Sequence, residues 1–328
     1  MSFSAVTVIR WIGKVKVVSR IFKASFLAWT LLAVSNTANG QDKLDILATI
    51  PDLGNLVEVI GGDRVEVEVL VKPGSDPHSV LPKASMLLKL SRADGLVFMG
   101  LDYEHAFLPA MLEKSRNKAV EPGADGYMNV GARIKALEVP KRLDRGEGAD
   151  LHPRGNPHFN LNPENGRIMA AAVRDLLSKI DPEFSAEYQK RWQVWDKEAQ
   201  KRITLWNKQM ASLRGKKIVV YHKSWSYFAK YFGLEVVATI EPKPGIAPSA
   251  AHLVKVRRIM KEQDVQIILM EPWYSASAIR SLVGEQTKVL RLPTASGVTK
   301  NSKSYLGFMD GLVDALRTAY GVKDDKPS

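Results

Sequence analysis

Residues 182–214 carry the longest helical pattern in this chain of 328 residues. Apolar residues recur there at steps of three and four, which is the spacing of one helix face. These positions are Tyr188, Trp192, Trp195, Ala199, Ile203, Trp206, Met210 and Leu213. Asp181 and Pro182 suit the cap and first turn of a helix, and residues 183–213 contain neither proline nor glycine. At roughly 1.5 Å per residue the helix would be about 48 Å long, which exceeds the size of one small domain.

Such a helix has two interpretations. It can cross two lobes of one chain as a rigid spine, or it can form the seam of a coiled-coil dimer. Tryptophan at three apolar positions suits packing against sheets better than coiled-coil packing. We therefore expect a spine within a monomer, and the length of the chain already favours two domains.

Strand and helix patterns alternate on both sides of the spine. Before it we expect strands at 44–50, 65–71 and 95–99, and helices at 53–60, 84–90 and 105–113. After Gly215 we expect strands at 217–220, 235–239, 265–270 and 288–292, and helices at 224–231, 249–261, 276–283 and 305–320. The predicted fold class is α/β, with two parallel-sheet lobes joined by a single long rigid helix.

The same patterns divide the chain into segments. We expect an N-terminal α/β lobe at 41–181, the linking helix at 182–214 and a C-terminal α/β lobe at 215–328. The charged, glycine-containing stretch Arg142–Gly155 interrupts the first lobe and is interpreted as a mobile surface loop.

The first forty residues form a separate segment with no acidic residue. Their basic residues are Arg10, Lys14, Lys16, Arg20 and Lys23. An apolar stretch, Phe26–Val34, and a small polar stretch, Ser35–Gly40, follow. This order is typical of a secretory signal peptide and predicts a periplasmic protein. Because the basic part is long, a start downstream of Met1 or an uncleaved anchor also fits the pattern.

Composition and charge exclude several classes of protein. The formal charge of +12 includes the five basic residues of the signal, so the mature chain carries about +7 (12 − 5). Its basic residues are dispersed among acids, whereas a nucleic-acid-binding surface needs a clustered patch. The chain has no cysteine, which excludes a thiol nucleophile and a lipid-modified cysteine anchor. No apolar run reaches the length of a membrane span.

Three of the six histidines lie in turn-like contexts near the ends of predicted strands: His78, His158 and His222. Neutral imidazoles are good ligands for transition metals, and ligands bind at the strand ends of open α/β sheets. Residues so far apart in sequence can meet only where separate parts of the fold converge, such as a cleft between two lobes. We therefore expect these three residues to form a metal site.

The other three histidines have less specific contexts. His105 is expected to be partly exposed on a helix, and His252 to be a surface or packing residue. His152, in the predicted loop, is either a loop residue or an auxiliary metal ligand. The zinc-protease, P-loop and serine-hydrolase motifs are absent from the sequence.

Longer segments around the three site histidines resemble the metal-contact motifs of the zinc/manganese-type substrate-binding proteins of ABC transporters. These segments are Gly74–His78, Asn156–Pro163 and Tyr221–Phe228, and Glu241–Ser249 and Leu269–Pro272 add to the likeness. The resemblance extends over residues 44–322. It implies that the metal lies in the cleft between the lobes and is handed to the membrane permease of a metal ABC transporter.

The chain departs from that family pattern in three places. The late loop Leu292–Gly297 lacks the aspartate that usually serves as fourth ligand, so Glu271 or water would take that position. The long histidine-rich loop is represented only by the short stretch with His152. Asn156 stands where an aspartate is common. Three imidazoles with a water or one carboxylate suit Zn²⁺, whereas Mn²⁺ prefers more oxygen ligands.

Three functions remain open at this point. A metal-capturing binding protein that is not an enzyme is the main hypothesis. A periplasmic zinc hydrolase is the alternative, because three histidines with an open position also suit a catalytic zinc, and Glu271 is the candidate general base. The third is an interaction protein whose cleft no longer binds metal. Metal content and hydrolytic turnover discriminate among them.

Overall fold

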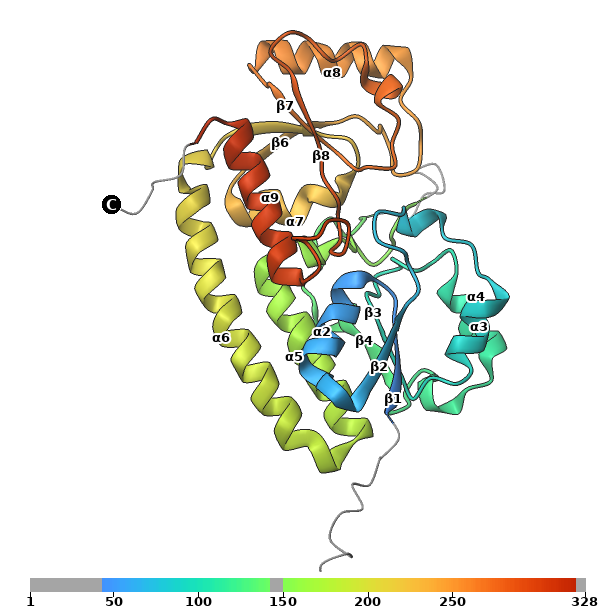
Figure 1. Ribbon diagram of the computed structural model, residues 1–328. Coiled ribbons are helices and arrows are strands. Elements are labelled where there is room, and N and C mark those ends of the chain that lie inside the picture. Colours follow the sequence, from blue (N-terminus) through green and yellow to red (C-terminus); the bar gives the residue numbers. More distant parts are fainter. Residues whose placement is uncertain (1–42, 142–149, 323–328) are drawn as a thin grey trace, which may run out of the picture. The chain divides into compact units, whose positions relative to one another are not determined.

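The computed structural model describes residues 43–141 and 150–322, and in this part of the chain it contains two four-stranded parallel sheets (Figure 1). The strand order is β2-β1-β3-β4 in the first sheet and β6-β5-β7-β8 in the second. The first sheet consists of β1 (Leu44–Ala48), β2 (Val65–Val69), β3 (Gly95–Phe98) and β4 (Tyr127–Asn129). The second consists of β5 (Lys217–Val220), β6 (Glu235–Thr239), β7 (Ile267–Met270) and β8 (Lys288–Arg291). The predicted α/β class with two parallel-sheet lobes is confirmed.

Helices cover both faces of each sheet, as parallel sheets require. The helices are α2 (Pro51–Gly61), α3 (Ala84–Leu90), α4 (Leu108–Ser115), α5 (Pro163–Ile180), α6 (Ser185–Met210), α7 (Ser226–Phe232), α8 (Ala250–Glu262) and α9 (Tyr305–Ala319). On the first sheet, α3 and α4 pack on one face, and α2 and α5 pack on the other. On the second sheet, α8 packs on one face, and α7 and α9 pack on the other.

One apolar core continues from the first lobe into the second. It includes Ile46 and Ala48 of β1, Ile218 and Val220 of β5, and Trp206 of α6. Because a close-packed interior resists expansion, a wide opening of the lobes would expose this shared core to water. The packing therefore favours small movements of loops over a large hinge motion.

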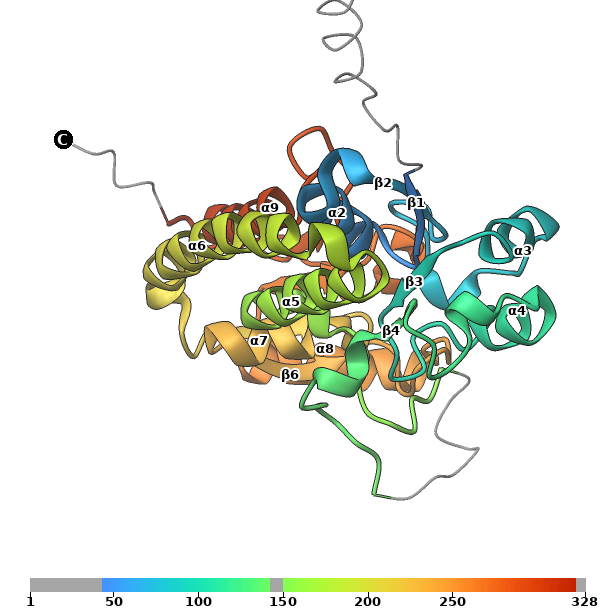
Figure 2. The same ribbon diagram turned by 90° about the horizontal axis from the view of Figure 1, so that it is seen from below.

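The long helix predicted between the lobes is confirmed as α6. Short 3-10 turns extend it at both ends, at Pro182–Phe184 and Ala211–Leu213, so the helical path covers residues 182–213 of the predicted 182–214. Pro182 lies in the first of these turns and not in the α-helix itself. Figures 1 and 2 show α5 running beside α6, and the two helices are in contact.

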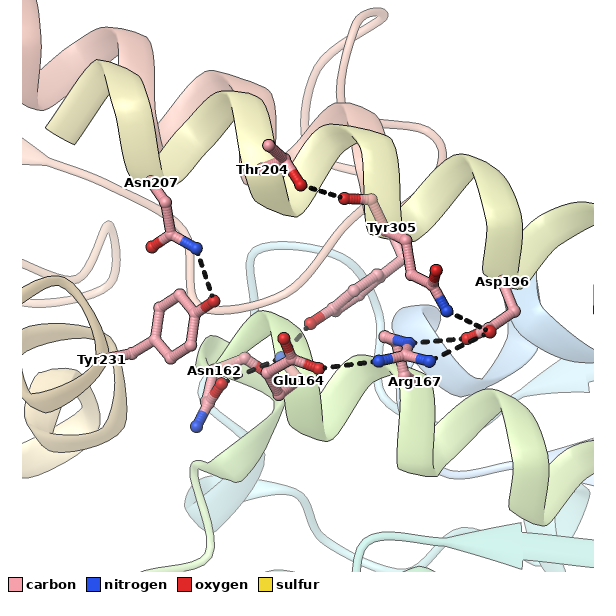
Figure 3. Close-up of polar contacts among 9 residues, drawn as sticks. Asn162, Glu164, Arg167, Asp196, Thr204, Asn207, Tyr231 and Tyr305 are labelled. Atoms are coloured by element: carbon pink, nitrogen blue, oxygen red, sulfur yellow. Dashed lines mark hydrogen bonds and ion pairs between the residues drawn. The ribbon is translucent and has the colours of Figure 1, made fainter.

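Polar contacts fix α5 against α6 (Figure 3). Arg167 of α5 donates from Nε to Asp196 Oδ1 of α6 at 2.7 Å and from Nη2 to Asp196 Oδ2 at 3.1 Å. Its Nη1 donates to Glu164 at 3.1 Å. The Tyr305 hydroxyl of α9 donates to the Asn160 carbonyl oxygen at 2.8 Å, directly before α5. These bonds tie the spine and α9 to the segment that leads out of the site.

The sequence patterns fail at four elements, one of which is strand β4 (Tyr127–Asn129), a three-residue strand that was not predicted. The helix predicted at 105–113 begins only at Leu108, because Leu101 and Asp102 have positive φ and residues 101–107 form turns. The helix predicted at 276–283 is a 3-10 turn at Ala276–Ile279. Helix α5 was not predicted, although the Asn162 side chain caps it by accepting from the Glu164 amide at 2.9 Å.

Three predicted segments fall wholly or partly outside the described residues: the signal peptide at 1–40, residues 142–149 of the loop, and the end of the chain after residue 322. Within the described ranges, no helix has both the length and the apolar character needed to cross a membrane.

Candidate metal centre

The first two site histidines lie in short turns that neighbouring side chains hold in place. His78 lies in the 3-10 turn Pro77–Ser79, which follows β2. Asp76 caps this turn, because its carboxylate accepts from the His78 amide at 3.0 Å and from the Ser79 hydroxyl at 2.5 Å. His158 directly precedes the turn Phe159–Leu161, and its amide donates to Asn156 Oδ1 at 2.9 Å.

The third histidine belongs to the second sheet. His222 follows Tyr221, whose amide extends the pairing of β5 by donating to the Leu269 carbonyl oxygen at 2.8 Å. His222 is the residue directly before the 3-10 turn Lys223–Trp225, which leads into α7. The carboxyl end of a parallel strand thus presents this imidazole, as expected for a ligand site in an α/β sheet.

The structure brings all three predicted site histidines together. One ring nitrogen from each of His78, His158 and His222 lies within 4.8 Å of the others, and the two Nε2 atoms of His78 and His158 are 3.3 Å apart. Zn–N bonds of about 2.0–2.1 Å in a tetrahedral site place two nitrogens about 3.3–3.4 Å apart. His158 is 2% exposed and His222 is 4% exposed. The arrangement can therefore hold a small cation with little movement.

Burial sets the protonation of two of these imidazoles. It lowers the pKa of His78 and of His158 well below the usual value, and the neighbouring histidines lower both further. Burial also acts to lower the pKa of His222. There the hydrogen bond to Glu241 and the charges of Glu271, Glu241 and Asp150 outweigh burial, and the pKa is raised. At pH 7 His78 and His158 are therefore neutral and have lone pairs available for a metal.

Glu241 orients the third imidazole. Its Oε2 lies 2.6 Å from His222 Nδ1, and its Oε1 accepts from the Tyr274 hydroxyl at 3.2 Å. A carboxylate on one ring nitrogen of a metal-binding histidine fixes the tautomer and directs the other nitrogen to the metal. In the sequence, Glu241 belongs to a segment that resembles the family pattern, but that resemblance indicates no role for it. The residue lies nineteen positions after His222, so no local spacing indicated the contact.

We expect Glu241→Gln to weaken zinc binding by about tenfold to a hundredfold, the usual effect of removing such a support. Glutamine keeps an acceptor for the Nδ1 proton but loses the negative charge that makes the imidazole a better ligand. Competition titration against a chromophoric chelator measures the change. Tyr274→Phe is the matched control, since it removes one bond to Glu241 and leaves the carboxylate. Wild-type affinity in Glu241→Gln would show that the carboxylate does not support a ligand.

Two further histidines border the site. The ring centroid of His78 lies 4.9 Å from that of His152 and 5.8 Å from that of His105. His152 is 8% exposed, neither of its ring nitrogens has a hydrogen-bond partner of normal geometry among the described residues, and burial lowers its pKa to about 3. His105 is exposed as expected, but it precedes α4 and lies beside the site. His252 lies in α8 and its Nε2 contacts the Thr239 carbonyl oxygen at 2.9 Å.

The carboxylates near the three histidines are not part of the group of converging donor atoms. Glu271 is fully buried after β7, and burial raises its pKa to about 7. Among the described residues, the only group of possible metal ligands whose donor atoms all lie within 4.8 Å of one another is His78, His158 and His222. Glu271 is not part of this group. In the late loop, the Ser296 amide donates to Asp52 Oδ2 of α2 at 3.2 Å, and the Thr294 carbonyl oxygen accepts from Asn160 Nδ2 at 2.8 Å. This loop therefore connects the lobes through buried polar contacts.

The fold and the three-histidine group define a class: a two-lobed α/β substrate-binding protein of the metal ABC transporter type. Residues 46–319 match the family described as zinc-uptake complex component A, periplasmic. Because the match covers most of the chain, the protein belongs to this family.

Individual relatives agree with this assignment. The chain is 26% identical over 303 residues to the zinc-binding lipoprotein AdcA of Streptococcus pneumoniae, covering 90% of this chain but 59% of AdcA. It is 25% identical over 317 residues to the high-affinity zinc uptake system protein ZnuA of Bacillus subtilis, covering 92% of this chain and 97% of that protein. A crystal structure of ZnuA matches with a TM-score of 0.71 at 26% identity, covering 85% of this chain and 99% of that one. The chain thus spans about three fifths of AdcA and nearly all of the Bacillus protein.

Proposed function

We propose that this protein captures one zinc ion with His78, His158 and His222 and delivers it to the membrane permease of an ABC transporter. The observation that carries the proposal is the convergence of three imidazole nitrogens within 4.8 Å of one another, from turns that belong to both lobes. Family membership supports the transport role. Calorimetry of metal-free protein tests it, with one high-affinity zinc site expected per chain and no saturable binding as the contrary result.

Zinc fits the proposed ligand set better than manganese. Three nitrogen donors with one open position suit tetrahedral Zn²⁺, whereas Mn²⁺ prefers more oxygen ligands. We propose that water takes the fourth position, with Glu271 and His152 as the neighbouring side chains that could replace it. Zinc titrations of Glu271→Gln and His152→Ala distinguish these choices, because only a true ligand is expected to change the affinity strongly.

We propose that the site binds metal without catalysing a reaction. A zinc hydrolase needs a general base within reach of the metal-bound water. The sequence offered Glu271 for this role, but its side chain is fully buried and lies outside the group of converging donor atoms. Turnover assays of the zinc-loaded protein with ester and peptide substrates test this, and turnover that Glu271→Gln abolishes would favour the hydrolase.

We also propose that the chain is exported to the periplasm by the signal in residues 1–40 and acts there as a monomer that does not bind nucleic acid. The basic and apolar order of that segment supports export, and the dispersed basic residues argue against a nucleic-acid surface. Mass spectrometry of the periplasmic fraction identifies the mature N-terminus, and light scattering gives the oligomeric state.

Zinc affinity is expected to fall as the pH drops from about 7.5 to 5, because protons compete for the imidazole lone pairs. His222, whose pKa is raised, takes up a proton first, while His78 and His158, whose pKa values are lowered, stay neutral to lower pH. The logarithm of the apparent Kd is therefore expected to change by about one unit per pH unit at first, not three. Chelator competition at several pH values measures this slope, and a flat profile would contradict a histidine site.

A further inference from the structure

The residue at position 156 connects two of the proposed ligands. Asn156 Oδ1 accepts from the His158 amide at 2.9 Å. Its Nδ2 donates to the Lys223 carbonyl oxygen, next to His222, and to Glu138 Oε2, both at 2.8 Å. The carboxamide thus uses its acceptor and both of its donor hydrogens.

The backbone of Asn156 is held equally firmly. Its amide donates to the Leu137 carbonyl oxygen at 2.8 Å, and its carbonyl oxygen accepts from the Tyr227 hydroxyl at 2.8 Å. The Tyr227 hydroxyl also accepts from the Leu137 amide at 3.0 Å. Asn156 is 6% exposed, so these groups have little access to water as a substitute partner. A change at this position would leave buried polar groups without partners.

The hydrogen-bond partners of the Asn156 side chain require one acceptor and one donor group at position 156. One side of the carboxamide faces an amide N–H, and the other side faces a carbonyl oxygen and the Glu138 carboxylate. Aspartate would keep the first contact, but its second oxygen would face two acceptors and a like charge. Glu138 also accepts from the Ser226 hydroxyl at 3.1 Å, so it is itself held in place at the start of α7.

We propose that Asn156 is a positioning residue, matched to Glu138, that sets His158 relative to His222 and so holds two ligands from different lobes at zinc-binding distance. The proposal rests on the proposed zinc-binding function. The presence of Glu138 makes the amide necessary, since only a donor can bridge to that carboxylate and to the Lys223 carbonyl oxygen.

The test compares Asn156→Asp, Glu138→Gln and the double variant. We expect Asn156→Asp to weaken zinc binding by about tenfold to a hundredfold, as other supporting residues do. Glu138→Gln alone is expected to stay within about twofold, since its amide can still serve both neighbours. In the double variant the glutamine can donate to the new carboxylate at position 156 and accept from Ser226, so roughly fivefold of the loss is expected to return. The Lys223 carbonyl oxygen stays without its donor, so recovery is partial.

Two readouts separate positioning from a general loss of stability. The visible spectrum of the Co²⁺-loaded protein reports ligand geometry, and we expect it to change in Asn156→Asp and to return toward wild type in the double variant. In metal-free protein, hydrogen exchange is expected to speed up in Asn156→Asp at residues 156–158 and 222–226, and to stay as in wild type at residues 76–79.

The outcomes are distinguishable. Wild-type protein that binds no zinc would overturn the proposed function, and the metal-free exchange experiment would still decide whether Asn156 holds the two turns. Wild-type affinity and exchange in Asn156→Asp would overturn the positioning role. A double variant as weak as Asn156→Asp would show that the match with Glu138 is not the cause.

Discussion

Zinc affinity is expected to fall by roughly a hundredfold to several thousandfold when His158 or His222 is replaced by alanine. Structural zinc sites bind with about 10–16 kcal/mol in total, so each of three or four ligands contributes roughly 3–5 kcal/mol, and about 1.4 kcal/mol is tenfold in Kd. Both side chains are buried, so water would have to enter an enclosed position to replace the lost nitrogen. His78→Ala is expected to act in the same direction, with a smaller loss because His78 is less buried.

The control for this series is His252→Ala, because His252 lies in α8 and bonds the Thr239 carbonyl oxygen outside the site. His105→Ala is a stricter control, because it removes an imidazole that lies beside His78 but is not a proposed ligand. In the wild-type protein, His105 Nδ1 contacts the Asp102 carbonyl oxygen at 3.0 Å. Calorimetry of all five variants would contradict the assignment if any two of the three site variants kept wild-type affinity.

Trp206→Ala is expected to lower the free energy of unfolding by about 3–5 kcal/mol, the range for removing a buried tryptophan or phenylalanine. Trp206 lies in α6, is 1% exposed and belongs to the core that both lobes share. Its Nε1 donates to Asp310 Oδ1 of α9 at 2.8 Å. The substitution therefore creates a cavity and removes a polar link between the spine and the last helix.

Urea denaturation of the metal-free protein measures this loss. Val194→Ala is the matched control on the same helix, because Val194 is 68% exposed and its truncation is expected to change stability by less than about 0.5 kcal/mol. Equal stabilities for Trp206→Ala and Val194→Ala would mean that α6 does not hold the lobes together through its buried face.

Most of the fold could be predicted because its signals are local. The spacing of apolar residues along one helix face predicts the spine, and residues 182–213 form one continuous helical path whose first and last turns are 3-10 helix. Each strand of the second sheet was predicted from a short apolar run. Helix α5 was missed because its clearest start signal, Asn162 before Pro163, lay inside a segment interpreted as part of the site.

The site was predictable only in part, for a physical reason. His78, His158 and His222 could be chosen because each lies in a recognisable turn sequence. The residues that hold these histidines in place could not be predicted from the sequence. The contacts of Asn156 with Glu138 and of His222 with Glu241 form only when segments distant in sequence fold together. The proximity of His105 and His152 to His78 has the same origin. The sequence alone predicts a partly exposed residue for His105, and for His152 either a loop residue or an auxiliary metal ligand.

Zinc K-edge X-ray absorption of the protein loaded with one equivalent of zinc tests the central claim most directly. We predict a coordination sphere with three imidazole nitrogens at about 2.0–2.1 Å and one further light ligand atom, with the imidazole signal reduced by one in His158→Ala. A coordination sphere dominated by carboxylate oxygens, or a spectrum unchanged in His158→Ala, would contradict a zinc site built from His78, His158 and His222.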